Sequence, residues 1–521
     1  MQELNLAREK NNKDMDIGKT LASDRFPNTM DSFWFSVNPD IIISPFDFVT
    51  VRHVFNTRTI GMVKEINATE EIGIAAKVAV MANTGIENDS PRTTSIAMPV
   101  GAAKPVRFAT QKEVIFALGI PEMLNPIPAG IIEMTNGLQV PISLDISYML
   151  GPDTAHVNAA GISGNLKTTY LFFLLQSAYQ RLVSDMQEDV AIIIFNTKEG
   201  ELLHIDQVKK ANKKTKQLFD LLDLDIKPFE NVTYLLPRGR DGKANSAAVP
   251  SNSRTYSFGL DDVYDRLDLL FGSDYENYNI SSILNYIYEA WPLFNGSKQV
   301  RTWSDLLEFT DYPQEVVAHK STLLRFLGYV QRFRKSPMFI DKKVTSIYLG
   351  KEIKKIRRNE VFVIDISMIP SLQEQGFVVG DVMKSIDELY SFSRQTSKRP
   401  KYILTFVDEI NRFIPRSPRN ISSAVAEQIM RTVVAGRSRG TILFSAQQFK
   451  STVDPALHEN TGMHMIAKLG MSELSTSPYF MLDKSTKANI VRLNKGELVM
   501  VHPAFRQPIK ILFPKAPFKT G

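Results

Sequence analysis

A glycine-bearing loop followed by a lysine and two threonines is the sharpest chemical signal in the sequence. The segment Gly161-Ile-Ser-Gly-Asn-Leu-Lys-Thr-Thr169 lies between an apolar run, 156–160, and a long amphipathic stretch. A strand, such a loop and a helix bind phosphates, because backbone N–H groups of the loop and of the helix N-terminus face the anion. Lys167 would then neutralise the β- and γ-phosphates and Thr168 would coordinate Mg²⁺. The sequence therefore predicts ATP and Mg²⁺ as cofactors, with a loop formed by Gly161, Ser163, Gly164, Asn165, Leu166, Lys167, Thr168 and Thr169.

One residue departs from the usual pattern of this loop. Leu166 stands where the pattern has its second glycine, and leucine does not tolerate the backbone angles or close approaches that glycine allows. The departure indicates a rearranged loop or weaker nucleotide binding. The alternative is a turn before a helix that happens to contain Lys-Thr.

An acidic pair at the end of an apolar run supplies what the loop needs. The run YILTFVDE, 402–409, ends in Asp408 and Glu409. A buried strand that ends in this way places Asp408 in the Mg²⁺ shell, and Glu409 polarises the attacking water. The alternative is a surface acidic turn after a core strand.

Two further candidates follow in the chain. The run TILFSAQQ, 441–448, ends in Gln447, which is placed to sense the γ-phosphate or the water. Just before it, Arg437 and Arg439 are candidates for an arginine that reaches the nucleotide of an adjacent subunit and stabilises transition-state charge. Surface ion pairs are the alternative for both arginines.

The elements that must position these residues can also be read from the sequence. Apolar runs at 156–160, 190–196, 234–236, 361–367, 402–409, 441–448 and 464–469 alternate with helical patterns. Alternation of this kind predicts an α/β fold around a mostly parallel sheet. The predicted organisation is an N-terminal extension at 1–45, a small β-barrel at 46–145, a core at 146–258 and 336–500, a helical insertion at 259–335, and a C-terminal β or tail segment at 501–521.

Composition excludes several classes of site. The 521 residues include no cysteine, which excludes disulfides, thiolate metal sites and cysteine nucleophiles, and seven histidines without zinc-hydrolase spacing. The charged N-terminus is unlike a secretion signal, and no run approaches the ~20 apolar residues that cross a bilayer. We therefore expect a cytoplasmic protein without a membrane partner.

The order and spacing of these motifs resemble the HerA group of the HerA/FtsK superfamily. The likeness covers roughly residues 45–515 and includes VDEINRF, GRSRGTILFSAQQF and the closing LNKGELVMVHP. It implies a RecA-like P-loop core, a HAS-type β-barrel, and a homo-hexameric, ATP-dependent translocase or helicase on double-stranded DNA. It also implies a partner nuclease or sirtuin-like effector, with antiphage defence as one setting. By motif position, Gln447 matches the sensor and Arg437 the inter-subunit arginine, whereas Asn196 stands where an acidic residue is usual.

Three basic clusters, at 209–216, 331–335 and 351–358, are candidates for sequence-independent contacts with the DNA backbone. Solvated helix faces are the alternative for each. Two other functions stay open. Leu166 and Asn196 favour a catalytically weak ring that assembles and gates an effector. A nucleotide-dependent switch or a peptide-handling ATPase is the third possibility.

Overall fold

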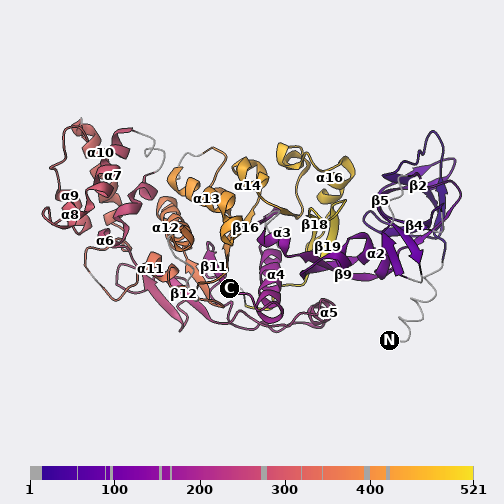
Figure 1. Ribbon diagram of the computed structural model, residues 1–521, viewed down its shortest axis with the longest axis horizontal. Coiled ribbons are helices and arrows are strands. Elements are labelled where there is room, and N and C mark those ends of the chain that lie inside the picture. Colours follow the sequence, from indigo (N-terminus) through magenta and orange to yellow (C-terminus); the bar gives the residue numbers. More distant parts are fainter. Residues whose placement is uncertain are drawn as a thin grey trace.

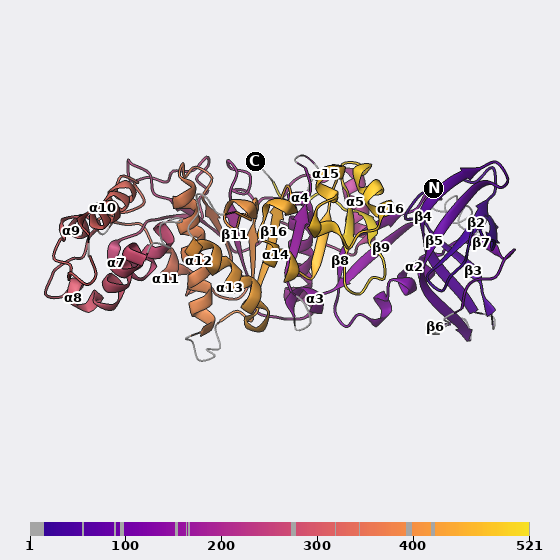
Figure 2. The ribbon, with the colours of Figure 1, turned by 90° about the horizontal axis from the view of Figure 1, so that it is seen from above.

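Three bodies follow one another along the long axis of the molecule. A β-barrel lies at one end, a large mixed sheet with its helices occupies the middle, and a helical body lies at the other end (Figures 1 and 2). The computed structural model describes residues 15–54, 57–87, 90–93, 98–151, 155–162, 164, 167–271, 278–317, 319–342, 344–391, 399–417 and 423–519.

The N-terminal body is an antiparallel barrel. Its strands are β1 (Gly18–Leu21), β2 (Ser32–Val37), β3 (Phe48–Arg52), β4 (Thr57–Thr69), β5 (Gly73–Glu87), β6 (Ser90–Thr93) and β7 (Pro105–Phe108). The order β2-β1-β7-β3-β4-β5 closes through pairing of β2 with β5, and β6 adds to the outside of β5. In β2 the side chains alternate strictly between buried and half-buried, as in a strand with one face in the barrel core.

The boundaries of this barrel differ from the predicted ones. β1 and β2 lie in the segment for which the sequence predicts an N-terminal extension. Both strands are short and lie between polar turns, so the sequence gives no clear strand pattern there. At the other end, β8 (Pro126–Glu133) and β9 (Gln139–Asp145) leave the barrel and join the large sheet through β19. Strand texture alone does not tell which of two sheets a strand joins.

The large sheet has the order β13-β12-β14-β11-β15-β16-β10-β17-β18-β19-β8-β9 within the described residues. The strands from β13 to β17 run parallel, and those from β17 to β9 antiparallel. Their bounds are β10 (Val157–Ala160), β11 (Val190–Asn196), β12 (Val232–Pro237), β13 (Ser253–Tyr256), β14 (Val361–Asp365), β15 (Tyr402–Val407), β16 (Thr441–Gln447), β17 (Met463–Ile466), β18 (Glu497–Val501) and β19 (Ile509–Leu512). All parallel strands therefore end at one edge, and the predicted α/β class is confirmed.

The central strands are continuous apolar runs because both faces of the sheet are covered. In β11 every side chain is buried: Ile192 and Ile194 belong to one hydrophobic cluster, and Ile193 and Phe195 to the cluster on the other face. The helices and the short helical turns described beside the barrel and the sheet are α2 (Gln111–Ala117), η2 (Ile120–Glu122), α3 (Ser147–Leu150), α4 (Lys167–Gln180), η3 (Arg181–Asp185), α5 (Lys213–Leu221), α11 (Leu349–Ile353), α12 (Leu372–Ser391), η6 (Ile410–Arg412), α13 (Ser423–Arg439), η7 (Lys450–Thr452), α14 (Pro455–Glu459), α15 (Met471–Leu474), η8 (Ser477–Tyr479) and α16 (Lys484–Val491).

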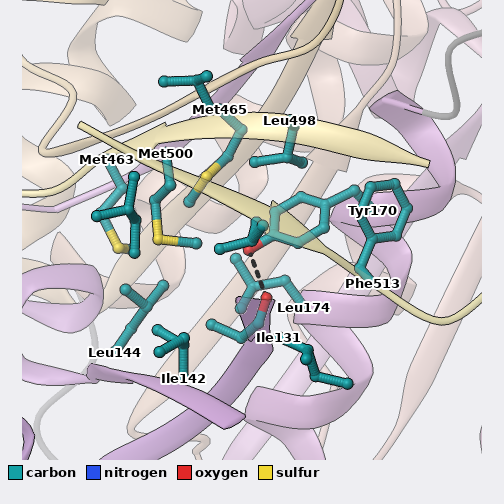
Figure 3. Packing of buried hydrophobic residues seen from close by; sticks show 14 of the residues in the cluster. Ile131, Ile142, Leu144, Tyr170, Leu174, Met463, Met465, Leu498, Met500 and Phe513 are labelled. Carbon is teal, nitrogen blue, oxygen red and sulfur yellow. Dashed lines mark hydrogen bonds between the residues drawn. The ribbon is translucent and has the colours of Figure 1, made fainter. Parts of the chain in front are cut away.

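Helix α4 follows the loop of the predicted phosphate site and is held from all sides. Tyr170 and Leu174 point into a cluster formed by methionines and aliphatic residues of β17, β18, β8 and β9 (Figure 3). The Tyr170 ring meets Phe513 edge-on at 4.9 Å, and its hydroxyl donates to the Ala129 carbonyl at 3.1 Å. The helix is therefore buried nearly all round, where the sequence predicts an amphipathic one.

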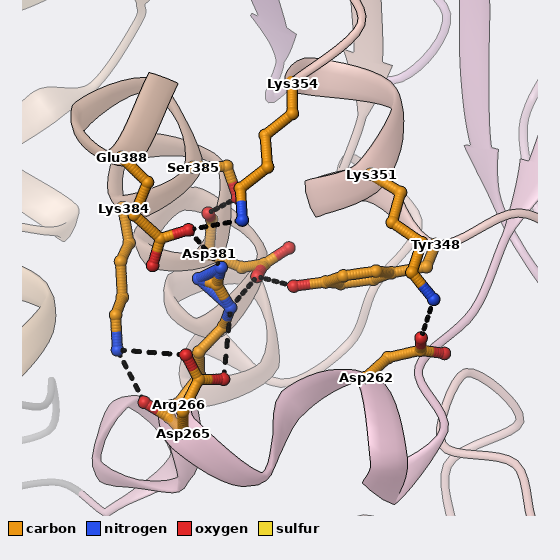
Figure 4. A network of polar contacts seen from close by, with 10 residues as sticks. All are labelled: Asp262, Asp265, Arg266, Tyr348, Lys351, Lys354, Asp381, Lys384, Ser385 and Glu388. Carbon is orange, nitrogen blue, oxygen red and sulfur yellow. Dashed lines mark hydrogen bonds and ion pairs between the residues drawn. The ribbon is translucent and has the colours of Figure 1, made fainter. Parts of the chain in front are cut away.

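The predicted insertion at 259–335 is helical in its described residues. It contains α6 (Leu260–Val263), η4 (Tyr264–Leu270), α7 (Tyr278–Glu289), α8 (Trp291–Asn295), α9 (Trp303–Glu308) and α10 (Lys320–Arg334). A buried ionic network joins it to α12: Arg266 contacts Asp381 at 3.1 Å and Glu388 at 2.8 Å, and Tyr348 donates to Asp381 at 2.9 Å (Figure 4). These pairs fix the helical body to the sheet.

One contact between the barrel and the far side of the sheet is made by a lysine with three partners. Lys64 of β4 lies 2.7 Å from an Asp483 carboxylate oxygen and donates to the Thr486 hydroxyl at 2.8 Å and to Gln507 at 3.3 Å. The Lys64 side chain is only 10% exposed. The barrel thus contacts the region between β17 and β19.

Candidate nucleotide site

The loop after β10 begins with a glycine that has no room for a side chain. A Cβ at Gly161 would meet the Ala467 Cβ at 2.7 Å. The Gly161 N–H donates to the Gln448 carbonyl at 3.2 Å, and the Ile162 N–H donates to the Lys468 carbonyl at 3.1 Å. Gly164 has φ +82°, a conformation that favours glycine. The loop therefore leaves the sheet between β16 and β17. Ser163, Asn165 and Leu166 lie outside the described residues.

The first turn of α4 meets the end of β15. The Thr168 hydroxyl donates to the Asp408 Oδ2 at 3.1 Å. Lys167 is 6% exposed, and its Nζ lies 4.0 Å from the Glu409 Oε1. Thr169, in the same turn of α4, is half-buried. The structure thus brings together the loop lysine, the threonine and the acidic pair from segments that are 240 residues apart.

The acidic pair sits on a sharp bend of the backbone. Asp408 is 2% exposed, and its Oδ1 accepts the N–H of Glu409 at 2.9 Å. Glu409 has φ 51° and ψ 47°, the left-handed region, and opens the 3₁₀ turn Ile410–Arg412. Non-glycine residues in this region carry strain that is commonly found at functional sites. The bend separates a buried carboxylate from one that is partly exposed.

Lys198 is a member of this cluster that the motifs do not single out. Its Nζ lies 2.7 Å from Asp408 Oδ2 and 3.8 Å from Glu409 Oε1. Burial opposes its charge, but the carboxylates of Asp408, Glu201 and Glu409 together outweigh burial and raise the pKa of Lys198. The lysine follows β11, which pairs with β15. A charged residue just beyond a second buried strand was the available signal.

Asn196 takes part in a buried polar pair. It ends β11, is fully buried, and donates through its Nδ2 to the Asp365 Oδ1 at 2.9 Å. Asp365 ends the neighbouring strand β14, opposite Asn196 in register. The carboxylate expected at the end of β11 therefore stands one strand further along the sheet, at Asp365.

Gln447 faces the neighbouring strand. Its side chain is fully buried and exchanges two hydrogen bonds of 2.8 Å with the Asn158 amide. Asn158 also donates to the Ser445 hydroxyl at 2.9 Å. Both polar ends of the Gln447 amide are thus occupied within the sheet, beside the point where the loop begins.

The two arginines lie at the opposite edge of the sheet. They end α13, and β16 starts at Thr441, so α13 ends where the parallel strands begin. Arg437 borders a hollow of about 240 Å³ beside His156 and Glu459. Arg439 forms an ion pair with Asp387. The structure does not bring either arginine to Lys167 and Asp408 of the same chain.

Comparison with known proteins adds similar folds but no family. No protein-family model and no curated protein matches the sequence. Among solved structures, the unbound bacterial conjugative coupling protein TrwB gives a TM-score of 0.45 at 13% identity, covering 72% of this chain and 88% of that chain. TrwB with the non-hydrolysable ATP analogue ADPNP gives 0.44 at 12% identity, with coverage of 69% and 85%. The genome packaging NTPase B204 from Sulfolobus turreted icosahedral virus 2, with ATP-gammaS, gives 0.24 at 12% identity, with coverage of 33% and 72%.

Two further features concern the described part of the chain as a whole. In the part of the chain that the structure describes, no helix has the length and apolar character needed to span a bilayer. The same residues contain no cluster of three or more histidine, cysteine, aspartate or glutamate side chains able to hold a metal ion.

Proposed function

We propose that this chain is a P-loop ATPase with a RecA-like core, of the HerA/FtsK type, that moves along double-stranded DNA. The contact that carries the proposal is the 3.1 Å hydrogen bond between Thr168 and Asp408, with Lys167 and Glu409 beside it. A lysine and a hydroxyl at a helix N-terminus, facing an Asp-Glu pair, form the set of groups that phosphoryl transfer requires.

The residues at the site fit a magnesium-bound triphosphate. The Thr168 hydroxyl and the Asp408 carboxylate are hard oxygen ligands of the kind that Mg²⁺ prefers. A positive charge is already accommodated at Asp408, because Lys198 lies 2.7 Å from its Oδ2. When bound, the ion would neutralise charge that develops on the β- and γ-phosphate oxygens.

The chain's own groups then have distinct roles. The first turn of α4 offers backbone N–H groups to the phosphates, whereas the N–H groups of Gly161 and Ile162 hold the start of the loop on the sheet. Lys167 adds a positive charge at the γ-phosphate, and Glu409 accepts a proton from the attacking water. Because Arg437 lies at the far edge of its own sheet, its proposed role requires a neighbouring subunit in a ring. The HerA branch, the hexamer, the effector and a role in antiphage defence rest on the motif resemblance.

Steady-state ATP hydrolysis, measured with and without linear duplex DNA, tests the proposal. Glu409→Gln should lower turnover by about 10²–10⁴-fold, because the amide cannot accept the proton, and should leave nucleotide binding intact. Lys167→Ala should weaken both. Wild-type turnover no faster than that of Glu409→Gln would defeat the motor.

A ring that assembles and gates an effector, with little turnover, is the second candidate. The observation in its favour is the Gln447 amide, whose two ends are both held by Asn158. This candidate predicts assembly that does not depend on nucleotide and turnover that Glu409→Gln leaves unchanged. Mass determination by light scattering, with and without ATP, separates it from the motor.

A further inference from the structure

A rigid turn that follows β12 carries three cations. The segment from Arg238 to Ala244, the basic hairpin, is closed by a β-bridge between its two ends. Within it the Gly239 N–H donates to the Lys243 carbonyl at 2.6 Å, and Gly242 has φ +82°. The cations are Arg238, Arg240 and Lys243. The bridge and this hydrogen bond fix the backbone of the turn, and Arg240 and Lys243 are exposed on it.

The basic hairpin keeps a net positive charge, because Asp241 offsets only one of its three cations. None of its three cations forms an ion pair with a described carboxylate, and the Asp241 carboxylate accepts the Lys243 backbone N–H at 3.0 Å. The cluster at 351–358 behaves differently: its ion pairs are Lys351–Asp262 (2.5 Å), Lys354–Glu388 (2.7 Å), Lys355–Glu352 (3.1 Å) and Arg358–Asp189 (3.5 Å). An anion bound at the hairpin would reduce the repulsion between its like charges.

The basic hairpin borders a hollow of about 510 Å³ with the right donors for a phosphate group. From the hairpin, Arg238, Asp241 and Lys243 line the hollow, and across it stand Arg254 and Thr255 of β13 with Thr345 and Ser346, whose hydroxyl is bonded to that of Ser257. The guanidinium of Arg254 forms an ion pair with Glu352 at 2.9 Å. Guanidinium, ammonium and hydroxyl groups together are the donors that contact phosphate oxygens of nucleic-acid backbones.

The basic hairpin stands at the same edge of the sheet as the nucleotide site. It follows the carboxyl end of β12, which is parallel to β14 and, through it, to β11 and β15. Two hydrogen bonds also connect the hairpin region with the end of β11. Just after the hairpin, Ser246 donates to Asp365, and Asp365 accepts from Asn196 at the end of β11.

We infer that the basic hairpin holds the phosphodiester backbone of duplex DNA, with Arg238, Arg240 and Lys243 at phosphates. The choice of DNA as the polyanion rests on the proposed function, whereas the preference for a polyanion rests on the net positive charge of the hairpin and on Arg254 beside it. Contacts of this kind are independent of base sequence and weaken with salt.

Binding of a short fluorescent duplex to the full chain, measured by anisotropy over a series of salt concentrations, tests the inference. Each lost phosphate contact reduces the slope of log K against log salt by about 0.9, so Arg238→Gln/Arg240→Gln/Lys243→Gln should reduce it by nearly 3. Affinity at low salt should fall about ten- to a hundredfold. Basal ATP hydrolysis and the melting temperature should stay at wild-type values, which shows that the variant is folded.

Two matched variants remove the same formal charge elsewhere. Lys351→Gln/Lys354→Gln/Lys355→Gln removes ion-paired lysines, and Lys213→Gln/Lys214→Gln/Lys216→Gln removes exposed lysines of α5. Both should reduce the slope by less than about 1. An α5 or ion-paired variant that matches or exceeds the hairpin variant would overturn the inference.

The remaining outcomes separate the inference from the proposed function. A wild-type chain that binds no duplex contradicts the DNA part of the proposed function itself. A wild-type chain that binds, with an unchanged hairpin variant, overturns the hairpin assignment alone. If inorganic phosphate displaces the duplex far better than chloride does at equal ionic strength, the hairpin is a site for a free anion. That result would also overturn the hairpin assignment.

Discussion

Asn196 shows how a single amide keeps a second carboxylate out of a buried polar pair at the end of β11. Its Nδ2 donates to a carboxylate, that of Asp365, in a fully buried position. A second carboxylate here would place two like charges within hydrogen-bond distance, away from water. We therefore expect Asn196→Asp to destabilise the fold by about 3 kcal/mol at neutral pH.

The stability of the Asn196→Asp variant should depend on pH in the way expected for a carboxyl group whose pKa is raised on folding. The folded state would hold a proton that the unfolded chain has already released, so stability falls as pH rises. Urea unfolding should show a larger deficit relative to wild type at about pH 8 than at about pH 5. Asn196→Ser, which adds no charge, is the control, and equal deficits at both pH values would contradict the explanation.

The site residues divide into those that a single sequence reveals and those that it does not. Lys167 and Thr168 follow a glycine-bearing loop, and Asp408 and Glu409 end an apolar run, so local patterns select them. Asp365 also ends an apolar run and Lys198 closely follows one, but neither belongs to a motif that links it to Lys167 and Asp408. They enter the site because β11 lies between β14 and β15, and that neighbour relation is set by tertiary packing.

At the scale of elements, His156 joins α13 to the sheet as a neutral group. Its Nδ1 accepts the Leu443 N–H at 2.9 Å, so the proton sits on Nε2, which donates to the Val433 carbonyl at 2.8 Å. A second proton would face the Leu443 donor. Burial lowers the pKa of His156 to about 4.

A lowered histidine pKa makes the fold sensitive to acid. Between about pH 6.5 and 4 the unfolded chain binds a proton that the folded chain excludes, so stability decreases as pH falls. The contribution of His156 is on the order of 3 kcal/mol. His156→Gln, which keeps one donor and one acceptor, should make the loss of stability with acid shallower in denaturant titrations. The exposed His319→Gln should keep the wild-type slope, and a slope unchanged in both variants would rule out this role.

The elements themselves were predictable where burial on both faces imposes a continuous apolar run. That condition holds for β10, β11, β14, β15, β16 and β17, whose positions the sequence predicts. It fails for β13, whose sequence SRTY is polar and lies at the edge of the sheet. It fails also for β1 and β2, because short strands between polar turns resemble an extension.

At the scale of the whole molecule, the position of Arg437 bears on how subunits would assemble. Asp408 follows the carboxyl end of β15, whereas Arg437 lies in the last turn of α13, just before β16 begins. The two residues therefore lie at opposite edges of one sheet. If Arg437 stabilises the transition state, it must do so in a neighbouring subunit. A head-to-tail ring joins the two edges, because a heterologous interface repeats one pair of unlike surfaces around the ring.

Mixed rings test this directly. Lys167→Ala removes the phosphate-binding lysine and Arg437→Ala removes the arginine, so each variant alone should hydrolyse ATP poorly, with Arg437→Ala still binding nucleotide. When the two are co-assembled, an intact loop faces an intact arginine at roughly a quarter of the interfaces of a random ring. Hydrolysis should then rise well above that of either variant, in a manner that depends on protein concentration. Activity that is only the average of the two variants would place Arg437 outside the reaction, because complementation requires that one subunit supply the group that its neighbour lacks.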